Sequence, residues 1–242
     1  MIKKRLDVRC VEIGLFDSRQ KAKAAIMAGD VMVNGVRVYD ASYSVKETDK
    51  IEIYQNLCPY VSRGGLKLKA AIDFFKIDLK GKICLDVGVA TGGFSDCMIK
   101  EGAKLVYGVD VGKGQVHERI LKDPLFVFMP DTNARYLKPD MFNPKPEFAA
   151  VDVSFISLKL ILPPLKNCME KKFEWVLLIK PQFELSPKDL RKGIVKTEEL
   201  RLKALKDIEN FVIGLGLKII GVIDCPVKGA KGNKEFLMKV EN

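Results

Sequence analysis

The feature that most constrains the fold is an alternation, from about residue 81 onward, of short apolar runs with segments of helical pattern. The apolar runs predict strands at 82–87, 105–109, 126–129, 148–152, 175–179, 218–224 and 236–240, with helices between most of them. Strands that alternate with helices are typical of a parallel sheet covered by helices on both faces. We therefore expect a doubly wound α/β domain, in which ligands bind at the carboxyl ends of the strands.

Residues 1–60 follow a different pattern and are predicted to form a small α+β domain, with residues 61–242 as the α/β domain. A first short helix is expected near the start. A second begins after Ser18, a residue type that caps helices, and ends at Gly29. The pair Asn34-Gly35 lies between two valine-rich runs, which is a strong signal for a two-residue β-hairpin. Two helices that lead into a hairpin make a compact module.

The composition favours a soluble protein of the cytoplasm. Hydrophobic residues make up 48% of the chain, and no apolar run approaches the roughly 20 residues that span a bilayer. The start of the chain carries charges where the apolar core of a secretory signal belongs, so neither secretion nor membrane insertion is expected. Six cysteines without Cys-x-x-Cys spacing argue against a disulfide framework and a structural metal. The single histidine, His117, is expected on the surface at a helix start. Most Ser-His and Cys-His mechanisms are thus disfavoured, unless His117 itself serves.

The chain is basic, with 41 Lys and Arg against 31 Asp and Glu and a formal charge of +10, so it attracts polyanions such as nucleic acids. Residues 1–60 carry only ten basic and eight acidic side chains, so RNA contact there requires a local patch. The candidates in this segment are Arg5, Arg9, Arg19, Lys21 and Lys23. A solvated helical face would explain the same charges. The stretch DSRQKAKAAIMAGDVMVNG, however, resembles the RNA-binding module of ribosomal small-subunit protein four, which implies binding to structured RNA.

The first strand of the α/β domain runs into the sequence LDVGVATGGFSD, residues 85–96, which we interpret as a cofactor loop. Its candidate residues are Asp86, Gly88, Gly92, Gly93 and Phe94. The spacing differs from the Gly-x-Gly-x-x-Gly loop that places a pyrophosphate at a helix N-terminus, and no phosphate-loop lysine follows. Because an acidic residue precedes the glycines, a cationic or zwitterionic ligand fits better than a phosphate.

Two further acidic residues follow the next strands. Asp110 ends the second strand, where a carboxylate can accept both hydroxyls of a ribose, and Asp131 follows the third, in a place to read an adenine amino group. S-adenosylmethionine needs an anion near its methionine end and a backbone-lined groove. The three strand-end carboxylates resemble those of class I methyltransferases, which implies S-adenosylmethionine as the cofactor. Phe94 and Phe155 are expected to pack beneath the ligand rather than to stack on a base.

Two motifs that the sequence lacks limit which atom could accept the methyl group. Enzymes that methylate an exocyclic base nitrogen usually carry an Asn- or Asp-Pro-Pro-aromatic loop after the fourth strand, whereas this chain has AAVDVSFISL. Enzymes that methylate the cytosine ring carbon need a nucleophilic cysteine, typically after proline, and the sequence contains no Pro-Cys pair. The sequence therefore disfavours methylation of an exocyclic base nitrogen and of the cytosine ring carbon.

Four ionisable residues that are far apart in the sequence are expected to meet above the sheet. Asp152 ends the fourth strand and Lys180, in WVLLIKPQFE, ends the fifth, while Lys67 lies on an entering helix and Glu235 just before the last strand. This order resembles the Lys-Asp-Lys-Glu tetrad of FtsJ-like ribose 2′-O-methyltransferases. With the N-terminal module, nearly the whole chain resembles the TlyA family of haemolysin-like methyltransferases. The resemblance implies methylation of a cytidine 2′-hydroxyl in ribosomal RNA or a ribosomal subunit, without a metal, and the short chain favours the branch that acts on 23S RNA.

In this hypothesis Lys180 is the central group. A ribose hydroxyl is a poor nucleophile at neutral pH, so a neutral Lys180 would take its proton, whereas a charged Lys180 would stabilise the developing oxyanion. Both protonation states stay open at this point. Lys67, Asp152 and Glu235 are expected to orient Lys180 and to tune its charge.

Several alternatives stay open as well. Arg63 is a candidate contact for RNA phosphate, as is Arg135, and Glu184 is expected near the site, but structural salt bridges explain these three at least as well. A methyltransferase for another RNA or for a small molecule, a membrane-active haemolysin, and a non-catalytic RNA-binding protein are the competing functions. The sequence does not predict the oligomeric state.

Overall fold

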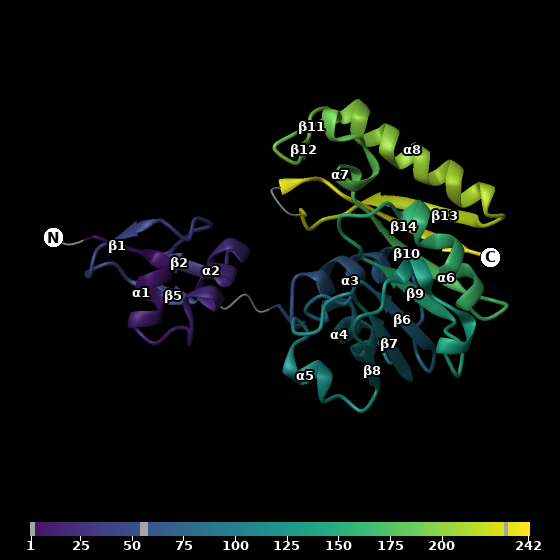
Figure 1. Cartoon of the computed structure of the whole chain (residues 1–242), viewed down its shortest axis with the longest axis horizontal. Coiled ribbons are helices and arrows are strands. Elements are labelled where there is room, and N and C mark those ends of the chain that lie inside the picture. The colour runs from purple at the N-terminus through teal and green to yellow at the C-terminus, as the bar shows by residue number, and fades with distance from the viewer. Residues whose placement is uncertain (1–2, 54–57, 230–231) are drawn as a thin grey trace. The chain divides into compact units, whose positions relative to one another are not determined.

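The computed structural model describes residues 3–53, 58–229 and 232–242 of the 242-residue chain. The chain forms two compact units, Met1–Pro59 and Tyr60–Asn242, each with its own hydrophobic core (Figure 1).

The first unit packs two helices against short antiparallel strands. Its elements are β1 (Lys4–Arg5), α1 (Leu6–Glu12), α2 (Arg19–Ala28), β2 (Val31–Val33), β3 (Val36–Arg37), β4 (Ser44–Val45) and β5 (Ile51–Ile53). Ser18 caps α2 by accepting a hydrogen bond from the backbone N–H of Lys21, and Gly29 ends it at a φ of 80°. Asn34 and Gly35 have φ of 50° and 80° and connect β2 to β3. The predicted second helix and hairpin are thus confirmed, whereas β1, β4 and β5 were not predicted.

A buried carboxylate holds the start of this unit together. Asp7 is only 1% exposed, and its oxygens accept hydrogen bonds from Arg5 at 2.9 and 3.0 Å and from Arg19 at 3.0 Å. The hydrogen bonds from Arg5, helped by Arg19 and opposed by burial, lower the pKa of Asp7 from 3.8 to about 2. Arg5 and Arg19, predicted as RNA contacts, therefore have a structural partner inside the unit.

Replacing Asp7 with Asn is expected to destabilise this unit by about 2 kcal/mol, because the three charge-assisted hydrogen bonds from Arg5 and Arg19 are weakened or lost. Hydrogen exchange of the α1 and α2 amides should show the loss. A group whose folded pKa is depressed stabilises the fold above its unfolded pKa, so the wild-type chain should lose this contribution as the pH falls from about 4 through about 2.

The matched control is Asp17→Asn, which removes an exposed carboxylate that pairs with Lys21 at 2.7 Å. It should change protection by less than about 0.5 kcal/mol. Equal protection in the Asp7 and Asp17 variants would contradict the structural role of Asp7.

The second unit is built on a seven-stranded sheet in the order β13-β14-β10-β9-β6-β7-β8. Its strands are β6 (Ile83–Val87), β7 (Leu105–Val109), β8 (Phe126–Met129), β9 (Phe148–Val151), β10 (Glu174–Ile179), β13 (Lys218–Asp224) and β14 (Phe236–Glu241). Each lies within one residue of its predicted bounds. Strands β6 to β10 pair in parallel, whereas β14 runs antiparallel to both β10 and β13.

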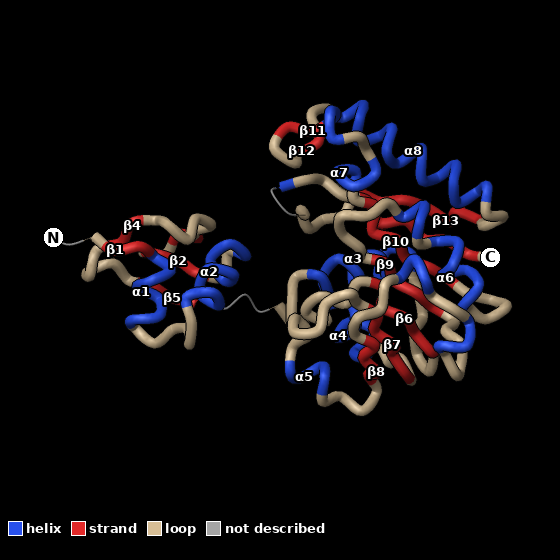
Figure 2. The backbone as a smooth tube through the Cα atoms, in the orientation of Figure 1, coloured by secondary structure: helices blue, strands red, loops and turns tan. Residues whose placement is uncertain are grey.

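Helices cover both faces of this sheet (Figure 2). The helices of the unit are α3 (Gly64–Phe75), α4 (Gly93–Lys100), α5 (Glu118–Leu121), α6 (Leu162–Cys168), α7 (Pro181–Glu184) and α8 (Glu198–Gly214), and a short hairpin, β11 (Leu190–Arg191) and β12 (Ile194–Val195), lies between α7 and α8. Apolar side chains of α6 and α8 share one core with alternate strand residues, while α3 and α4 pack together and against β14 and β7. The predicted doubly wound α/β architecture is confirmed.

Four features of the described residues bear on the candidate function. All six cysteines are free thiols. Within residues 3–53, 58–229 and 232–242, no group of three or more His, Cys, Asp or Glu side chains is arranged to hold a metal ion. In the same part of the chain, every helix is too short or too polar to cross a lipid bilayer. His117 is exposed and caps α5, as predicted.

Candidate active site

The carboxyl ends of the parallel strands surround a cavity of about 480 Å³. Its lining comes from the segments that follow β6, β7, β8 and β9, and includes Gly88, Asp110, Gln115, Asn133 and Asp152. Parallel strands that start at one edge of a sheet end together at the other, so the loops after them converge. The cavity therefore lies where the strand order predicted a ligand.

Asp86 lies at the end of β6 with one oxygen satisfied and one without a partner. It is fully buried, and its Oδ2 accepts hydrogen bonds from the backbone N–H of Ser95 at 2.9 Å and from the Ser95 hydroxyl at 2.6 Å. Its Oδ1 has no hydrogen-bond partner among the described residues. Burial raises the pKa of Asp86 to about 7, and the negative charge of the nearby Asp152 adds to this rise. The hydrogen bonds from Ser95 oppose it. A buried acceptor without a donor is costly, and a cationic donor would relieve the cost.

Glycines allow the loops to approach closely. Gly88 has a φ of 93°, and a Cβ there would lie 2.5 Å from the backbone oxygen of Asp152. A Cβ at Gly93 would lie 2.2 Å from the Ser62 hydroxyl, so the starts of α3 and α4 touch. Gly92 caps α4 at a φ of 92°, and Phe94 is buried in the core. Of these glycines, Gly88 lines the cavity, whereas Gly92 and Gly93 shape the packing behind it.

Of the two other predicted cofactor carboxylates, one lines the cavity and the other does not. Asp110 lines the cavity, and its oxygens accept hydrogen bonds from the backbone N–H groups of Ala90 and Gly112, both at 2.8 Å. Asp131 is exposed, pairs with Lys113 at 2.7 Å, and is not part of the cavity lining, although the next two residues are. The adenine contact of Asp131 thus stays a prediction that the geometry does not favour.

The four predicted catalytic residues form two ion pairs. Lys67 Nζ lies 2.6 Å from Glu235 Oε2, and Lys180 Nζ lies 2.5 Å from Asp152 Oδ1. Lys67 is 9% exposed and Glu235 1%. Burial favours the neutral form of Lys67, but Asp152 and Glu235 together outweigh it and raise its pKa, so Lys67 keeps its positive charge at neutral pH. The influence of Asp152 on Lys67 links the two pairs into one cluster.

Sequence reasoning missed two polar side chains of this cluster. Lys180 donates a hydrogen bond to the Ser154 hydroxyl at 2.8 Å, and the side-chain amide of Gln182 donates one to Glu235 Oε1 at 3.3 Å. Each follows a predicted residue by two positions, Ser154 after Asp152 and Gln182, in α7, after Lys180, and this closeness in sequence is the signal that could have found them. Gly229 also belongs here, because a Cβ on it would lie 1.9 Å from Glu235 Oε1.

Two other residues near the cluster behave differently from the expectations. Phe155 lines the cavity, is 90% exposed at a φ of 64° and contacts Phe183, so it is not part of the core, and its packing beneath the ligand stays a prediction. Glu184 accepts hydrogen bonds from the Ser157 hydroxyl at 2.5 Å and the Leu158 N–H at 2.9 Å, and burial raises its pKa. Glu184 therefore anchors the loop that follows Asp152.

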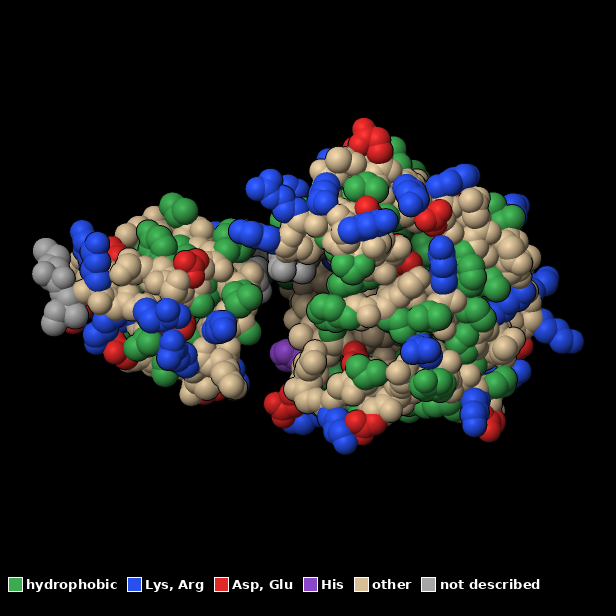
Figure 3. Space-filling model, turned by 45° about the horizontal axis from the view of Figure 1, so that its top comes forward, with side chains coloured by type: hydrophobic (Ala, Val, Ile, Leu, Met, Phe, Trp, Pro, Cys, Tyr) green, Lys and Arg blue, Asp and Glu red, His purple; other side chains and the backbone are tan. Residues whose placement is uncertain are grey.

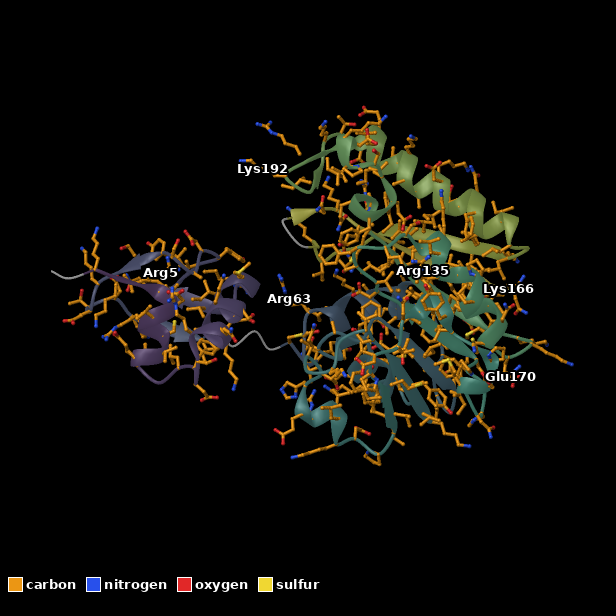
Figure 4. All side chains as sticks on the ribbon, viewed as in Figure 1. Arg5, Arg63, Arg135, Lys166, Glu170 and Lys192 are labelled. Carbon is orange, nitrogen blue, oxygen red and sulfur yellow. The ribbon has the colours of Figure 1, made fainter. Side chains whose placement is uncertain are left out.

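The remaining predicted RNA contacts are surface residues. Arg9 lies 3.4 Å from Glu12, and Lys21 pairs with Asp17. Lys23, on α2, and Arg63, at the start of α3 (labelled in Figure 4), are exposed, and neither forms an ion pair with an acid in the described part of the chain. Their charges are thus available to a ligand.

The sheet order, with one reversed strand beside β10, and the strand-end carboxylates define a Rossmann-like methyltransferase. Comparison with known proteins agrees: the sequence matches the FtsJ-like methyltransferase family over residues 60–241 and the S4 domain over residues 4–51. The chain belongs to the FtsJ-like methyltransferase family, with an S4 domain before the methyltransferase unit.

Three relatives show the range of names in this group. Hemolysin A of Brachyspira hyodysenteriae is 43% identical over 96% of this chain and 98% of its own length. The 16S/23S rRNA (cytidine-2′-O)-methyltransferase TlyA of Mycobacterium tuberculosis is 34% identical over 97% of this chain and 88% of its own. A solved Streptococcus thermophilus structure that carries a hemolysin name is 38% identical and covers 100% of this chain and 89% of its own, with a TM-score of 0.79.

The buried Lys67–Glu235 pair leads to a stability prediction. Lys67→Met should destabilise the methyltransferase unit by about 3–5 kcal/mol, because it leaves a buried carboxylate without its partner. Adding Glu235→Gln to that variant should recover at least half of the loss. Urea unfolding followed by the fluorescence of Trp175, the single tryptophan, which is fully buried in β10, measures both changes.

Lys69→Met is the control from the same helix, because Lys69 pairs at 2.6 Å with the exposed Asp73. This variant should lose less than about 1 kcal/mol. If the double variant were no more stable than Lys67→Met, the buried pair would not account for the loss.

Proposed function

We propose that the chain transfers a methyl group from S-adenosylmethionine to the 2′-hydroxyl of a cytidine in ribosomal RNA. The observation that carries this proposal is the convergence of Lys67, Asp152, Lys180 and Glu235 in two ion pairs beside the strand-end cavity. Membership of the FtsJ-like family and the printed activity of the M. tuberculosis relative support it.

The residues of the cavity fit S-adenosylmethionine. Asp86 is fully buried and does not itself line the cavity, but its Oδ1 has no hydrogen-bond partner among the described residues, and a carboxylate oxygen of this kind suits the methionine ammonium group. Both Asp110 oxygens keep a lone pair after their backbone bonds, so they can accept the two ribose hydroxyls. When bound, the cofactor supplies an electrophilic methyl group on a sulfonium. Gly88 keeps the neighbouring backbone open because it carries no side chain.

Lys180 is placed to act on the acceptor oxygen. Its ammonium group lies between Asp152 and Ser154 at the end of β10. A neutral Lys180 takes the hydroxyl proton, and a charged Lys180 stabilises the oxyanion as the proton leaves to solvent. The positive Lys67, held by Glu235, fixes the position of Asp152 and hence that of Lys180. A solvent-exchangeable proton transfer in the rate-limiting step, measured as a solvent isotope effect on methyl transfer, would favour the first route.

In this proposal the S4 domain contributes contacts to the RNA. Lys23 is available on its surface, and Arg9, Arg5 and Arg19 keep part of their side chains exposed beside their acidic partners. Phosphate contacts from such side chains position a nucleic acid without reading its sequence. Arg63 extends this set into the methyltransferase unit.

Lys180→Ala should lower methyl transfer by at least about 100-fold, because one group that contacts the reacting oxygen is lost. Cofactor affinity, measured by calorimetry, should change less than about threefold. Asp110→Asn should show the opposite pattern, with cofactor binding weakened about tenfold. Lys122→Ala, which removes an exposed lysine on the surface, is the neutral control. Turnover of Lys180→Ala equal to that of the wild type would remove Lys180 from the mechanism.

The function itself is tested by mass mapping of ribosomal RNA from cells with and without the gene. We expect a ribose-methylated cytidine, first of all in 23S RNA, to be absent without the gene. Labelled methyl should then appear on ribose when the purified protein is given the unmodified RNA. Identical maps for both ribosomal RNAs would count against the proposal. The hemolysin names of relatives raise lysis as a second candidate, and lysis of liposomes by the purified protein without cofactor would favour it.

A further inference from the structure

The positive charge of the chain is concentrated in two short segments. Residues 186–196 and 226–234 contain seven Lys or Arg and a single acidic residue, Asp189. The other 222 residues contain 34 basic and 30 acidic side chains, so these 20 residues carry more than half of the formal charge of +10. The first segment contains the β11–β12 hairpin, and the second leads into β14.

The structure joins the two segments through a buried asparagine. Asn233 is 4% exposed, its Nδ2 donates a hydrogen bond to the Gly193 carbonyl at 3.0 Å, and its Oδ1 accepts one from the Val195 N–H at 3.1 Å. The hairpin also packs against α7 and α8. The described residues of the two segments, 186–196, 226–229 and 232–234, form one surface, the cationic ridge, whose exposed basic residues are Lys188, Arg191, Lys192, Lys196, Lys228 and Lys234.

The cationic ridge adjoins the catalytic cluster. Lys234 directly precedes Glu235, Gly229 lies against the Glu235 carboxylate, and α7, which packs on the hairpin, donates to Glu235 through Gln182. The cluster itself contains two lysines and two carboxylates, so it offers little attraction to a polyanion. Attraction near the site therefore has to come from its surroundings.

Three charges of the ridge are open to a ligand, because among the described residues Arg191, Lys228 and Lys234 form no ion pair with an acidic side chain. In Figure 3, Lys and Arg side chains lie along the upper edge of the methyltransferase unit, with acidic side chains among them. A membrane-binding surface combines basic with apolar side chains. Among the described residues of the ridge, Ile194, at 41%, is the single exposed large apolar side chain. This composition favours a polyanion over a lipid surface.

We propose that the cationic ridge binds the phosphates of the RNA strand that flanks the methylated nucleotide. The proposal rests on the proposed function and deepens it, because it assigns RNA contact to the methyltransferase unit as well as to the S4 domain. Contacts of this kind strengthen binding and bring no sequence preference. They should therefore affect the affinity for RNA and leave the chemical step unchanged.

The test is a triple variant, Arg191→Gln, Lys192→Gln and Lys234→Gln, assayed on ribosomal RNA from cells that lack the gene. We expect KM for RNA to rise about tenfold at about 150 mM salt, with kcat and cofactor affinity unchanged. The slope of log kcat/KM against log salt concentration should become shallower by about 2, since each lost phosphate contact on a single strand contributes about 0.7. Trp175 fluorescence verifies that the variant is folded.

The matched control changes three exposed lysines in the loops before β9 and β10: Lys145→Gln, Lys171→Gln and Lys172→Gln. These loops are at the amino ends of the strands, and Glu170 next to them lies across the unit from Lys192 in Figure 4. This variant should change KM less than about twofold.

Three results would overturn the proposal. One is a triple variant whose KM for RNA and salt dependence equal those of the wild type. If the wild-type protein methylates RNA in the same assay, this result leaves the proposed function intact. Another is an equal loss in the control variant. The third is a triple variant that loses only binding to phosphatidylglycerol vesicles and keeps full RNA methylation. A wild type that methylates neither ribosomal RNA would instead reject the proposed function, and the ridge proposal with it.

Discussion

The register of the strands around β10 is the constraint on which the site depends. Val87, Val151 and Leu177 are cross-strand neighbours, so the chain leaves β6 and β9 at the same level, at Gly88 and Asp152. On the other side of β10, Ile179 is opposite Phe236 of the antiparallel β14. The next residues outward are Lys180 and Glu235. A single strand thus places a lysine between carboxylates from its two neighbours, and a slip by one residue would turn each of these side chains to the other face.

Charge balance then decides what the cluster can do. Lys67 is buried, which alone would favour its neutral form, yet Asp152 and Glu235 keep it charged. A buried pair of this kind contributes little net stability compared with apolar packing, because desolvation offsets most of the attraction. Its value here is positional, since it fixes Glu235 against Lys67, whose charge also interacts with Asp152, the ion-pair partner of Lys180. The Asp7 carboxylate has a similar role in the first unit, where it fixes two arginines by hydrogen bonds.

The basic residues of the catalytic cluster and those of the cationic ridge have different proposed roles. The lysines of the catalytic cluster are matched by carboxylates, whereas the two segments of the cationic ridge contain seven Lys or Arg and a single acidic residue. In the proposed function, a reaction centre built from paired charges beside a cationic surface separates chemistry from binding. The attraction of RNA to the ridge would then be sensitive to salt, while the buried Lys67–Glu235 pair would be screened much less.

The sequence by itself determined the elements. Apolar periodicity, the Ser18 cap and the Asn34-Gly35 turn are local signals, so the main strands and the hairpin were predicted closely, and the strand ends marked Asp86, Asp110, Asp152 and Lys180. Only the tertiary structure decided which charges meet. Lys67 and Glu235 are 168 residues apart, Arg5 and Arg19 turn to Asp7, Asp131 turns to Lys113, and Asn233 ties the hairpin to the loop before β14. Such pairings depend on how distant elements pack, and no local period in the chain encodes them.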